Sequence, residues 1–276
     1  MPAEWGGVVP TETFLDEGKK IVDEASTHKI PLRLIGGVAI RVHSVDFAEF
    51  AKKLSRLGPG EQEYTDLDFM SYARFREALR KFFDSIGYRK RRTTLSSAAT
   101  QRHIYFHPDG WFSADVFFDK LLAANHPINF KGRLELDSPT ISLADLLLEK
   151  LQIVSFTQKD LKDTLLLLRA HGLGDGHALE AIDTRYIASI LAKDWGFWYT
   201  VTTNLKGLRN AISEATELNE TDKSDITSKI GRLLGIIESE PKTTGWKMRS
   251  VIGTKKRWYN PVETTETVGE FGIWRL

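Results

Sequence analysis

Residues 64–70, YTDLDFM, decide how the first half of this chain is interpreted. Polar and apolar residues alternate here, which is typical of a β-strand with one buried face. Residues two apart on a strand point the same way, so we expect Asp66 and Asp68 on one face, with Cα atoms about 6–7 Å apart. Two carboxylates this close repel each other unless a cation lies between them. The pair predicts a site for a divalent cation such as Mg²⁺. The alternative is an ordinary strand face exposed to water.

A second feature precedes this strand. Residues 31–37, PLRLIGG, predict a short buried strand that ends at Gly36 and Gly37, directly before a helix. Glycine lets backbone N–H groups approach a phosphate closely, and a helix N-terminus adds a favourable dipole. The two glycines therefore indicate a place for phosphate groups, and the alternative is a plain strand-to-helix turn.

A third carboxylate follows the first two along the chain. Residues 102–107 and 111–118 read as two strands joined by the turn signal PDG, so they predict a β-hairpin. Asp115 is a lone carboxylate in the otherwise apolar second strand. Placed near Asp66 and Asp68 it would allow a second cation to bind. The alternative is a strand residue that faces solvent.

The remainder of the chain predicts helices. Residues 142–156 form a strongly apolar segment, and residues 157–173 form another, with Thr157 as N-cap and Asp160 at the third helical position. After the turn-rich sequence at 172–176, only helices are expected up to residue 240, followed by an irregular tail. We therefore expect an α/β domain over residues 1–174 and a helical domain with an irregular tail over residues 175–276.

Composition excludes several classes of protein. Hydrophobic residues make up 41% of the 276 residues and charged residues 27%, which is ordinary for a globular protein. There is no cysteine, so thiolate chemistry, iron–sulfur clusters and cysteine-based zinc sites are excluded. The N-terminus does not resemble a signal peptide, and no apolar stretch approaches the roughly 20 residues of a membrane span. A soluble, cytoplasmic protein without a membrane partner is expected.

The order of these motifs resembles the nucleotidyltransferase superfamily that includes DNA polymerase β, and within it the AbiEii-type group, some members of which are toxins of toxin–antitoxin systems. The resemblance extends over roughly residues 30 to 170. The motifs that carry it are LIGGVAIRVHS at 34–44, YTDLDFM at 64–70, SADVFF at 113–118, LLLEKLQIVS at 146–155 and QKDLKDTLLLL at 158–168. It implies an α+β fold with a mixed sheet flanked by helices, followed by a C-terminal helical domain.

The resemblance also implies an activity and its residues. The protein would use Mg²⁺ or Mn²⁺ to move an NMP from an NTP to an acceptor hydroxyl. The metal ligands would be Asp66, Asp68 and Asp115, and Asp115 would accept the proton of the acceptor. The catalytic candidates are Asp66, Asp68, Asp115 and Lys150, and the nucleotide-binding candidates are Gly36, Gly37, Lys150, Asp160 and Asp163.

Several interpretations stay open at this level. Lys150 either meets the nucleotide phosphates or extends from the end of a buried stripe. Asp160 and Asp163 belong either to the site or to helix capping and ordinary helix surface. The basic residues 89–92 either face a polyanionic substrate or form a solvated loop.

The acceptor is equally open. It is RNA or protein if the chain is a toxin, which would then have an antitoxin partner. The alternative acceptor is a small molecule of the antibiotic type. A further alternative is that the protein binds nucleotide without catalysing any transfer. The net charge of +1 does not separate these possibilities.

Overall fold

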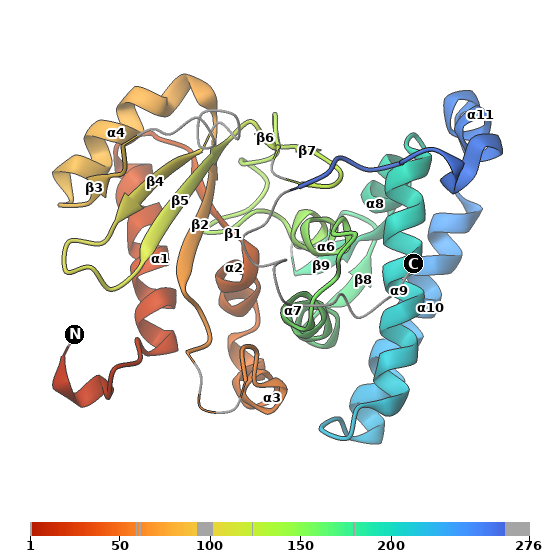
Figure 1. The fold of residues 1–276 in the computed structure, drawn as a ribbon, viewed down its shortest axis with the longest axis horizontal. Coiled ribbons are helices and arrows are strands. Elements are labelled where there is room, and N and C mark those ends of the chain that lie inside the picture. Colours follow the sequence, from red (N-terminus) through yellow and green to blue (C-terminus); the bar gives the residue numbers. More distant parts are fainter. Residues whose placement is uncertain are drawn as a thin grey trace. The chain divides into compact units, whose positions relative to one another are not determined.

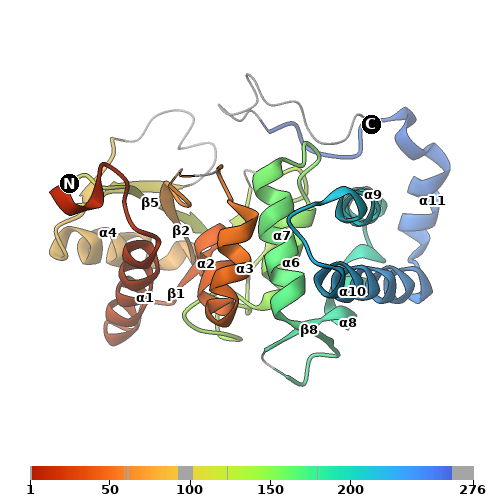
Figure 2. The same ribbon diagram turned by 90° about the horizontal axis from the view of Figure 1, so that it is seen from below.

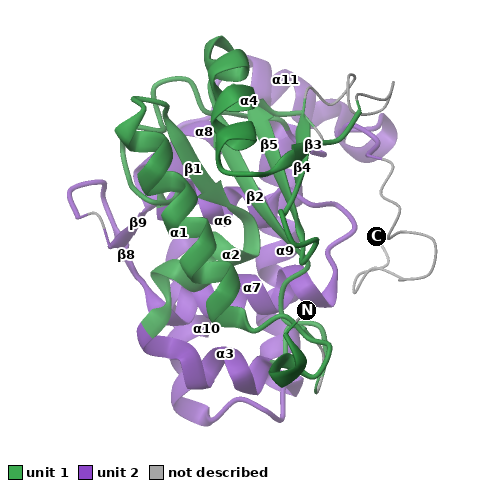
Figure 3. Ribbon diagram, turned by 90° about the vertical axis from the view of Figure 1, so that its left-hand side faces the viewer, with its two compact units in different colours: residues 1–45, 55–123, 127–142 green, residues 46–54, 124–126, 143–276 purple. Residues whose placement is uncertain are grey.

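The computed structural model of the protein contains both helices and a mixed sheet, which confirms the α+β class (Figure 1). It describes residues 2–58, 60, 62–92, 102–122, 124–178 and 180–262. These residues fall into two compact units, coloured green and purple in Figure 3. Unit 1 comprises Met1–Val45, Ser55–Ala123 and Pro127–Ser142, and unit 2 comprises Asp46–Leu54, Ala124–His126 and Leu143–Leu276.

A five-stranded sheet with the order β1-β2-β5-β4-β3 forms the centre of unit 1. Its strands are β1 (Leu32–Ile35), β2 (Asp66–Ser71), β3 (Arg89–Lys90), β4 (His103–Phe106) and β5 (Ser113–Phe118). β2 and β5 run parallel, whereas the other neighbouring strands are antiparallel. The strand with the two aspartates and the hairpin formed by β4 and β5 are therefore confirmed. A small antiparallel pair, β6 (Lys120–Leu121) and β7 (Ile128–Asn129), follows.

Helices cover one face of this sheet (Figure 2). The helices of unit 1 are α1 (Thr11–Thr27), α2 (Gly36–His43) and α4 (Arg76–Ser85), with short 3₁₀ turns at Ala3–Trp5 and Ala73–Phe75. Phe83 of α4 stacks on Tyr105 of β4 with ring centroids 4.2 Å apart, and it also contacts Phe69 of β2. Gly18 of α1 lies against Leu67 of β2, where a Cβ atom would come within 3.5 Å of that side chain. The face of β2 that carries Leu67 and Phe69 is therefore the covered one, and Asp66 and Asp68 point to the opposite face.

Unit 2 is mainly helical. It contains α3 (Ala48–Leu54), α6 (Leu143–Leu151), α7 (Gln158–Ala170), α8 (Thr184–Leu191), α9 (Trp195–Glu214), α10 (Glu220–Ser239) and α11 (Thr244–Ile252), the 3₁₀ turn Gly253–Lys255, and the short parallel strands β8 (Gly172–Gly174) and β9 (Ala181–Asp183). A further 3₁₀ turn, Val45–Phe47, precedes α3. The two longest helices, α9 and α10, pack side by side, and α10 also contacts α7 and α8.

The division between the units differs from the boundary that the sequence predicted near residue 174. Helices α6 and α7, which were assigned to the first domain, pack with the helices that follow residue 175. The reason lies in their composition. Nearly every residue of α6 is buried, including residues that do not share one helix face, so the helix needs neighbours all around it.

Three details of the second half also differ from the prediction. Residues 181–183 form a strand that pairs with β8, not a helix, and the following helix begins only after Asp183, which caps it by accepting the N–H of Tyr186 at 3.0 Å. Asp194 caps α9 in the same way and separates it from α8. The tail after residue 240 is not irregular throughout, since it contains α11; residues 263–276 of that tail lie outside the described residues.

No helix in the described part of the chain is long and apolar enough to cross a membrane.

Candidate functional site

Three aspartates project from one face of the sheet in unit 1. On the parallel strands β2 and β5, the Cα atom of Asp68 is the partner of Asp115, and that of Asp66 is the partner of Ser113. Partners on neighbouring strands lie about 4.8 Å apart and point to the same side. Asp66, Asp68 and Asp115, which we call the acidic triad, therefore share the face opposite α1 and α4. The structure brings together the three carboxylates that the sequence marked as candidate metal ligands.

Asp115 is the buried member of the acidic triad. Only 6% of the residue is exposed, and burial raises the pKa of its carboxyl to about 6, even though Arg102 acts in the opposite direction. The charge of Asp66 raises this pKa further, as expected of a carboxylate close by. Asp66 and Asp68 themselves are half-buried. The negative charge of Asp115 therefore lies where water compensates it poorly.

The two carboxylate oxygens of Asp115 differ in their surroundings. Oδ2 forms an ion pair with the Nη1 atom of Arg102 at 2.9 Å. Oδ1 is buried and accepts no hydrogen bond from any described residue. A buried acceptor without a partner costs roughly 1–3 kcal/mol. A divalent cation with a preference for oxygen ligands would satisfy this atom, so the donor set fits Mg²⁺ or Mn²⁺.

The two glycines lie beside the acidic triad. Ile35, the last residue of β1, is the register partner of Asp68, and α2 begins at the next residue, Gly36. Gly36 has φ of +72°, a conformation that glycine adopts without strain. A Cβ atom on Gly37 would lie 2.6 Å from the guanidinium of Arg56, so this side chain sits directly against the glycine backbone. The first turn of α2 thus starts next to Asp68, and the change from strand to helix at these glycines is the one that the sequence predicted.

Lys150, Asp160 and Asp163 form a second group of charges, in unit 2. The Nζ atom of Lys150 lies 3.0 Å from Asp163 Oδ2 and 3.8 Å from Asp160 Oδ1. All three residues are buried, so we call them the buried ion cluster. Lys150 therefore does not extend to solvent from the end of a stripe, and its ammonium is paired with carboxylates inside the unit.

Asp160 also has the capping role that the sequence allowed. The hydroxyl of Thr157 accepts the N–H of Asp160, and the carboxylate of Asp160 accepts the N–H of Thr157 at 3.2 Å. This reciprocal capping box satisfies two N–H groups at the start of α7. The capping prediction is confirmed, and the same carboxylate contributes to the buried ion cluster.

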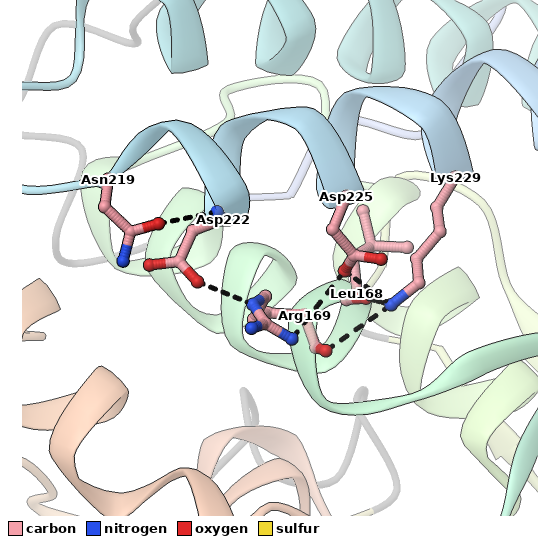
Figure 4. Close-up of polar contacts among 6 residues, drawn as sticks. All are labelled: Leu168, Arg169, Asn219, Asp222, Asp225 and Lys229. Atoms are coloured by element: carbon pink, nitrogen blue, oxygen red, sulfur yellow. Dashed lines mark hydrogen bonds and ion pairs between the residues drawn. The ribbon is translucent and has the colours of Figure 1, made fainter.

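The helix that carries Asp160 and Asp163 is also fixed at its other end (Figure 4). Arg169, near the end of α7, pairs with Asp222 of α10 at 2.7 Å. Lys229 of α10 donates to the carbonyl oxygen of Leu168 at 2.8 Å and pairs with Asp225 at 2.7 Å. A cation at the last carbonyls of a helix satisfies acceptors that would otherwise lack a partner. These contacts of α10 hold α7, and with it the buried ion cluster, in place.

Sequence reasoning missed two arginines. Arg102 pairs with Asp115, and Arg56 covers Gly37 while its Nη1 atom donates to the carbonyl oxygen of Glu63 at 2.7 Å. Neither arginine stands in a motif, and each reaches its neighbour only through strand pairing or a loop. No pattern in the sequence identifies them.

Comparison of the chain with protein-family models, with curated proteins and with solved structures gave no match. The interpretation of the site therefore depends on its own residues, and the resemblance inferred from the motifs stays a prediction.

Proposed function

We propose that the protein is a divalent-cation-dependent nucleotidyltransferase that moves an NMP from an NTP to an acceptor hydroxyl. The observation that carries this proposal is the acidic triad, with Asp68 and Asp115 in register on adjacent parallel strands. A cation that is bound together with substrate phosphates requires several carboxylates on one face. The acidic triad supplies three, and one of them has a buried oxygen that no described residue satisfies.

Each residue of the site has a role in this proposal. Asp66 and Asp68 would hold one cation, and all three carboxylates would hold a second. The bound cations would neutralise phosphate charge and lower the pKa of the acceptor hydroxyl. Asp115 is the member best suited to accept the acceptor's proton, because burial raises its pKa to about 6, closer to neutrality than that of an ordinary aspartate. Proton transfer is most efficient when the pKa of the base lies near the working pH.

The start of α2 supports the binding of phosphates. Gly36 and Gly37 carry no side chain, so a triphosphate can approach the backbone where α2 begins beside Asp68. The resemblance also assigns Lys150, Asp160 and Asp163 to nucleotide binding, and this assignment stays a prediction. The fold would then be nucleotidyltransferase-like, with the helical unit choosing the acceptor.

The wider setting is part of the same proposal. The acceptor would be an RNA or a protein in the cytoplasm, and the chain would act as the toxin of a toxin–antitoxin pair, with an antitoxin as its partner. A small-molecule acceptor is an outcome that the following experiment detects.

The test is a transfer assay. The protein is incubated with each of the four α-labelled NTPs, Mg²⁺, and total RNA, a protein extract or a panel of small hydroxylated antibiotics. The wild type should label one class of acceptor. Loss of a residue that only supports a metal ligand lowers activity roughly 10–100-fold. Asp68→Asn removes a proposed ligand itself, so it should reduce labelling by more than this.

A matched control is Asp84→Asn on α4. Asp84 is an exposed aspartate that pairs with Arg80, and its helix packs on the covered side of the sheet. This variant should transfer at the wild-type rate. Labelling that is equal in Asp68→Asn and wild type would refute the proposal, and NTP binding without any labelling would indicate a module without catalysis.

A further inference from the structure

Basic residues continue the row of the acidic triad across the same face of the sheet. On β4, Ile104 is the partner of Asp115, and the N–H of Arg91 donates to the carbonyl oxygen of Ile104 at 2.8 Å. This register places Arg91 on the face of Asp115, and its charge lowers the pKa of that carboxyl. Arg89, two residues earlier, points to the same side as Arg91.

A second row runs parallel to the first. Arg89 is the partner of Phe106 on β4, Phe106 is the partner of Ser113 on β5, and Ser113 is the partner of Asp66 on β2. Partners across a sheet share a face. Phe106 therefore lies between an arginine and a member of the acidic triad, and 46% of it is exposed.

Arg102 joins these rows to the acidic triad directly. It stands just before β4, pairs with Asp115 at 2.9 Å, and its guanidinium lies 6.0 Å from the ring of Phe117, which is two residues beyond Asp115. Its side chain is 36% exposed. We call Arg89, Arg91 and Arg102, with Phe106 among them, the arginine strip.

The partners of the arginine strip are few. Arg89 and Arg91 are exposed, and neither forms an ion pair or a side-chain hydrogen bond with any residue that the structure describes. Charged residues often protect an edge strand such as β3 from pairing with other chains. That explanation accounts for the arginines, but it does not account for an exposed phenylalanine beside them on the face that carries the acidic triad.

We propose that the arginine strip is an anion subsite that binds the phosphates of a nucleotide or nucleic acid, with Phe106 against a base. The proposal rests on the proposed nucleotidyltransferase function, since it places this ligand beside the acidic triad. Arginine binds phosphate oxygens through paired N–H donors, and an exposed aromatic ring stacks on any base. Arg102 forms the inner end of the subsite, because its guanidinium already reaches the acidic triad. The phosphates come either from the NTP or from an acceptor strand.

The test measures binding in EDTA, so that it does not depend on cations or on transfer. Two probes are used: a fluorescent single-stranded RNA of about 12 nucleotides, and inorganic tripolyphosphate, followed by calorimetry. The double variant Arg89→Gln/Arg91→Gln is compared with Lys20→Gln/Lys81→Gln. The control pair removes the same charge from exposed positions on α1 and α4, the helices that cover the other face.

The arginine variant should weaken at least one probe about tenfold, and the lysine variant should weaken neither by more than twofold. If the RNA is the ligand, the slope of log K against log salt should fall by roughly 1.4, at about 0.7 per phosphate contact on a single strand. Phe106→Leu should weaken the RNA probe and leave tripolyphosphate binding unchanged, because only the RNA carries bases.

The two probes distinguish the sources of the phosphate. A loss confined to tripolyphosphate assigns the subsite to the NTP, and a loss that includes the RNA assigns it to an acceptor strand. Unchanged binding of both probes, or equal losses in the arginine and lysine variants, overturns the inference. A protein that binds through the arginine strip but labels no acceptor would refute the proposed function and leave the subsite standing.

Discussion

The acidic triad of unit 1 and the buried ion cluster of unit 2 are both built from aspartates, yet their charges are arranged in opposite ways. In the cluster, the ammonium of Lys150 lies between Asp160 and Asp163, and Asp160 also caps α7. In the triad, three carboxylates share one face, and Asp115 keeps one buried oxygen that no described residue satisfies. Removing one partner of the first arrangement leaves a buried charge without compensation, whereas the unsatisfied buried oxygen of Asp115 costs free energy unless a ligand binds it.

The largest difference should appear when one carboxylate is removed from each group. Asp163→Asn leaves the buried Lys150 with less compensation, and breaking a buried pair in this way costs about 3–5 kcal/mol. We expect the variant to lose stability of this size in urea unfolding at pH 7.5. A loss below about 1 kcal/mol would show that the cluster is not structural, and would strengthen the case for Lys150 as a phosphate ligand.

The matching change in the acidic triad should act in the other direction. The pKa of Asp115 is raised to about 6 in the folded protein, above its ordinary value near 3.8, so the native state holds its proton more tightly than the unfolded state does. Its contribution to stability therefore falls as pH rises from about 4 to 6, and it stays unfavourable above that window. In EDTA at pH 8, Asp115→Asn should be more stable than the wild type by about 3 kcal/mol.

Thermal unfolding of both proteins between pH 4.5 and 8 checks the sign of this effect. The gap between variant and wild type should open as pH rises and should be small at pH 4.5. A variant that is less stable at every pH would mean that Asp115 is a structural residue.

A smaller loss should follow removal of the cap that connects α7 to the cluster. Thr157→Ala deletes the hydroxyl that accepts the N–H of Asp160, and loss of such a cap costs about 1 kcal/mol. Thr157→Ser keeps the hydroxyl and serves as the control, so it should lose only a few tenths of that amount. Equal losses in both variants would attribute the effect to the methyl group instead.

The smallest effect concerns the ion pair between Arg102 and Asp115. Arg102 lowers the pKa of Asp115, so Arg102→Gln should raise that pKa above its value of about 6. The change in stability should stay below about 1 kcal/mol, because the side chain of Arg102 is more than one-third exposed and water screens the pair. Carboxyl NMR titration with and without the substitution measures the shift; a lower pKa in the variant would contradict the assignment.

Local patterns predicted much of unit 1 and some of unit 2. Alternation placed Asp66 and Asp68 on one strand face, and the glycines after residue 35 marked the start of α2. The Thr157 capping box was also readable, because all its members lie within four residues. These features depend on residues that are close together in the sequence, so the sequence alone was enough to predict them.

Features that depend on distant contacts were not readable. The pairing of Arg102 with Asp115 follows from strand register, and the position of Lys150 between two carboxylates follows from the packing of α6 on α7. The division into units differs from the predicted boundary for the same reason, since α6 is buried on nearly every side and the sequence does not state which elements surround it. Sequence alone marked the aspartates of both groups but did not show which group encloses a lysine and which shares one face of the sheet.

Mn²⁺ titration, followed by calorimetry and electron paramagnetic resonance, tests most directly whether the acidic triad binds a divalent cation, as we propose. At pH 7.5 the wild type and the Asp84→Asn control should bind Mn²⁺ alike, whereas Asp68→Asn and Asp115→Asn should lose most of the affinity. Binding by the wild type should also weaken as pH falls through about 6, where Asp115 takes up a proton. Equal Mn²⁺ binding by the wild type, Asp68→Asn and Asp115→Asn would contradict the account.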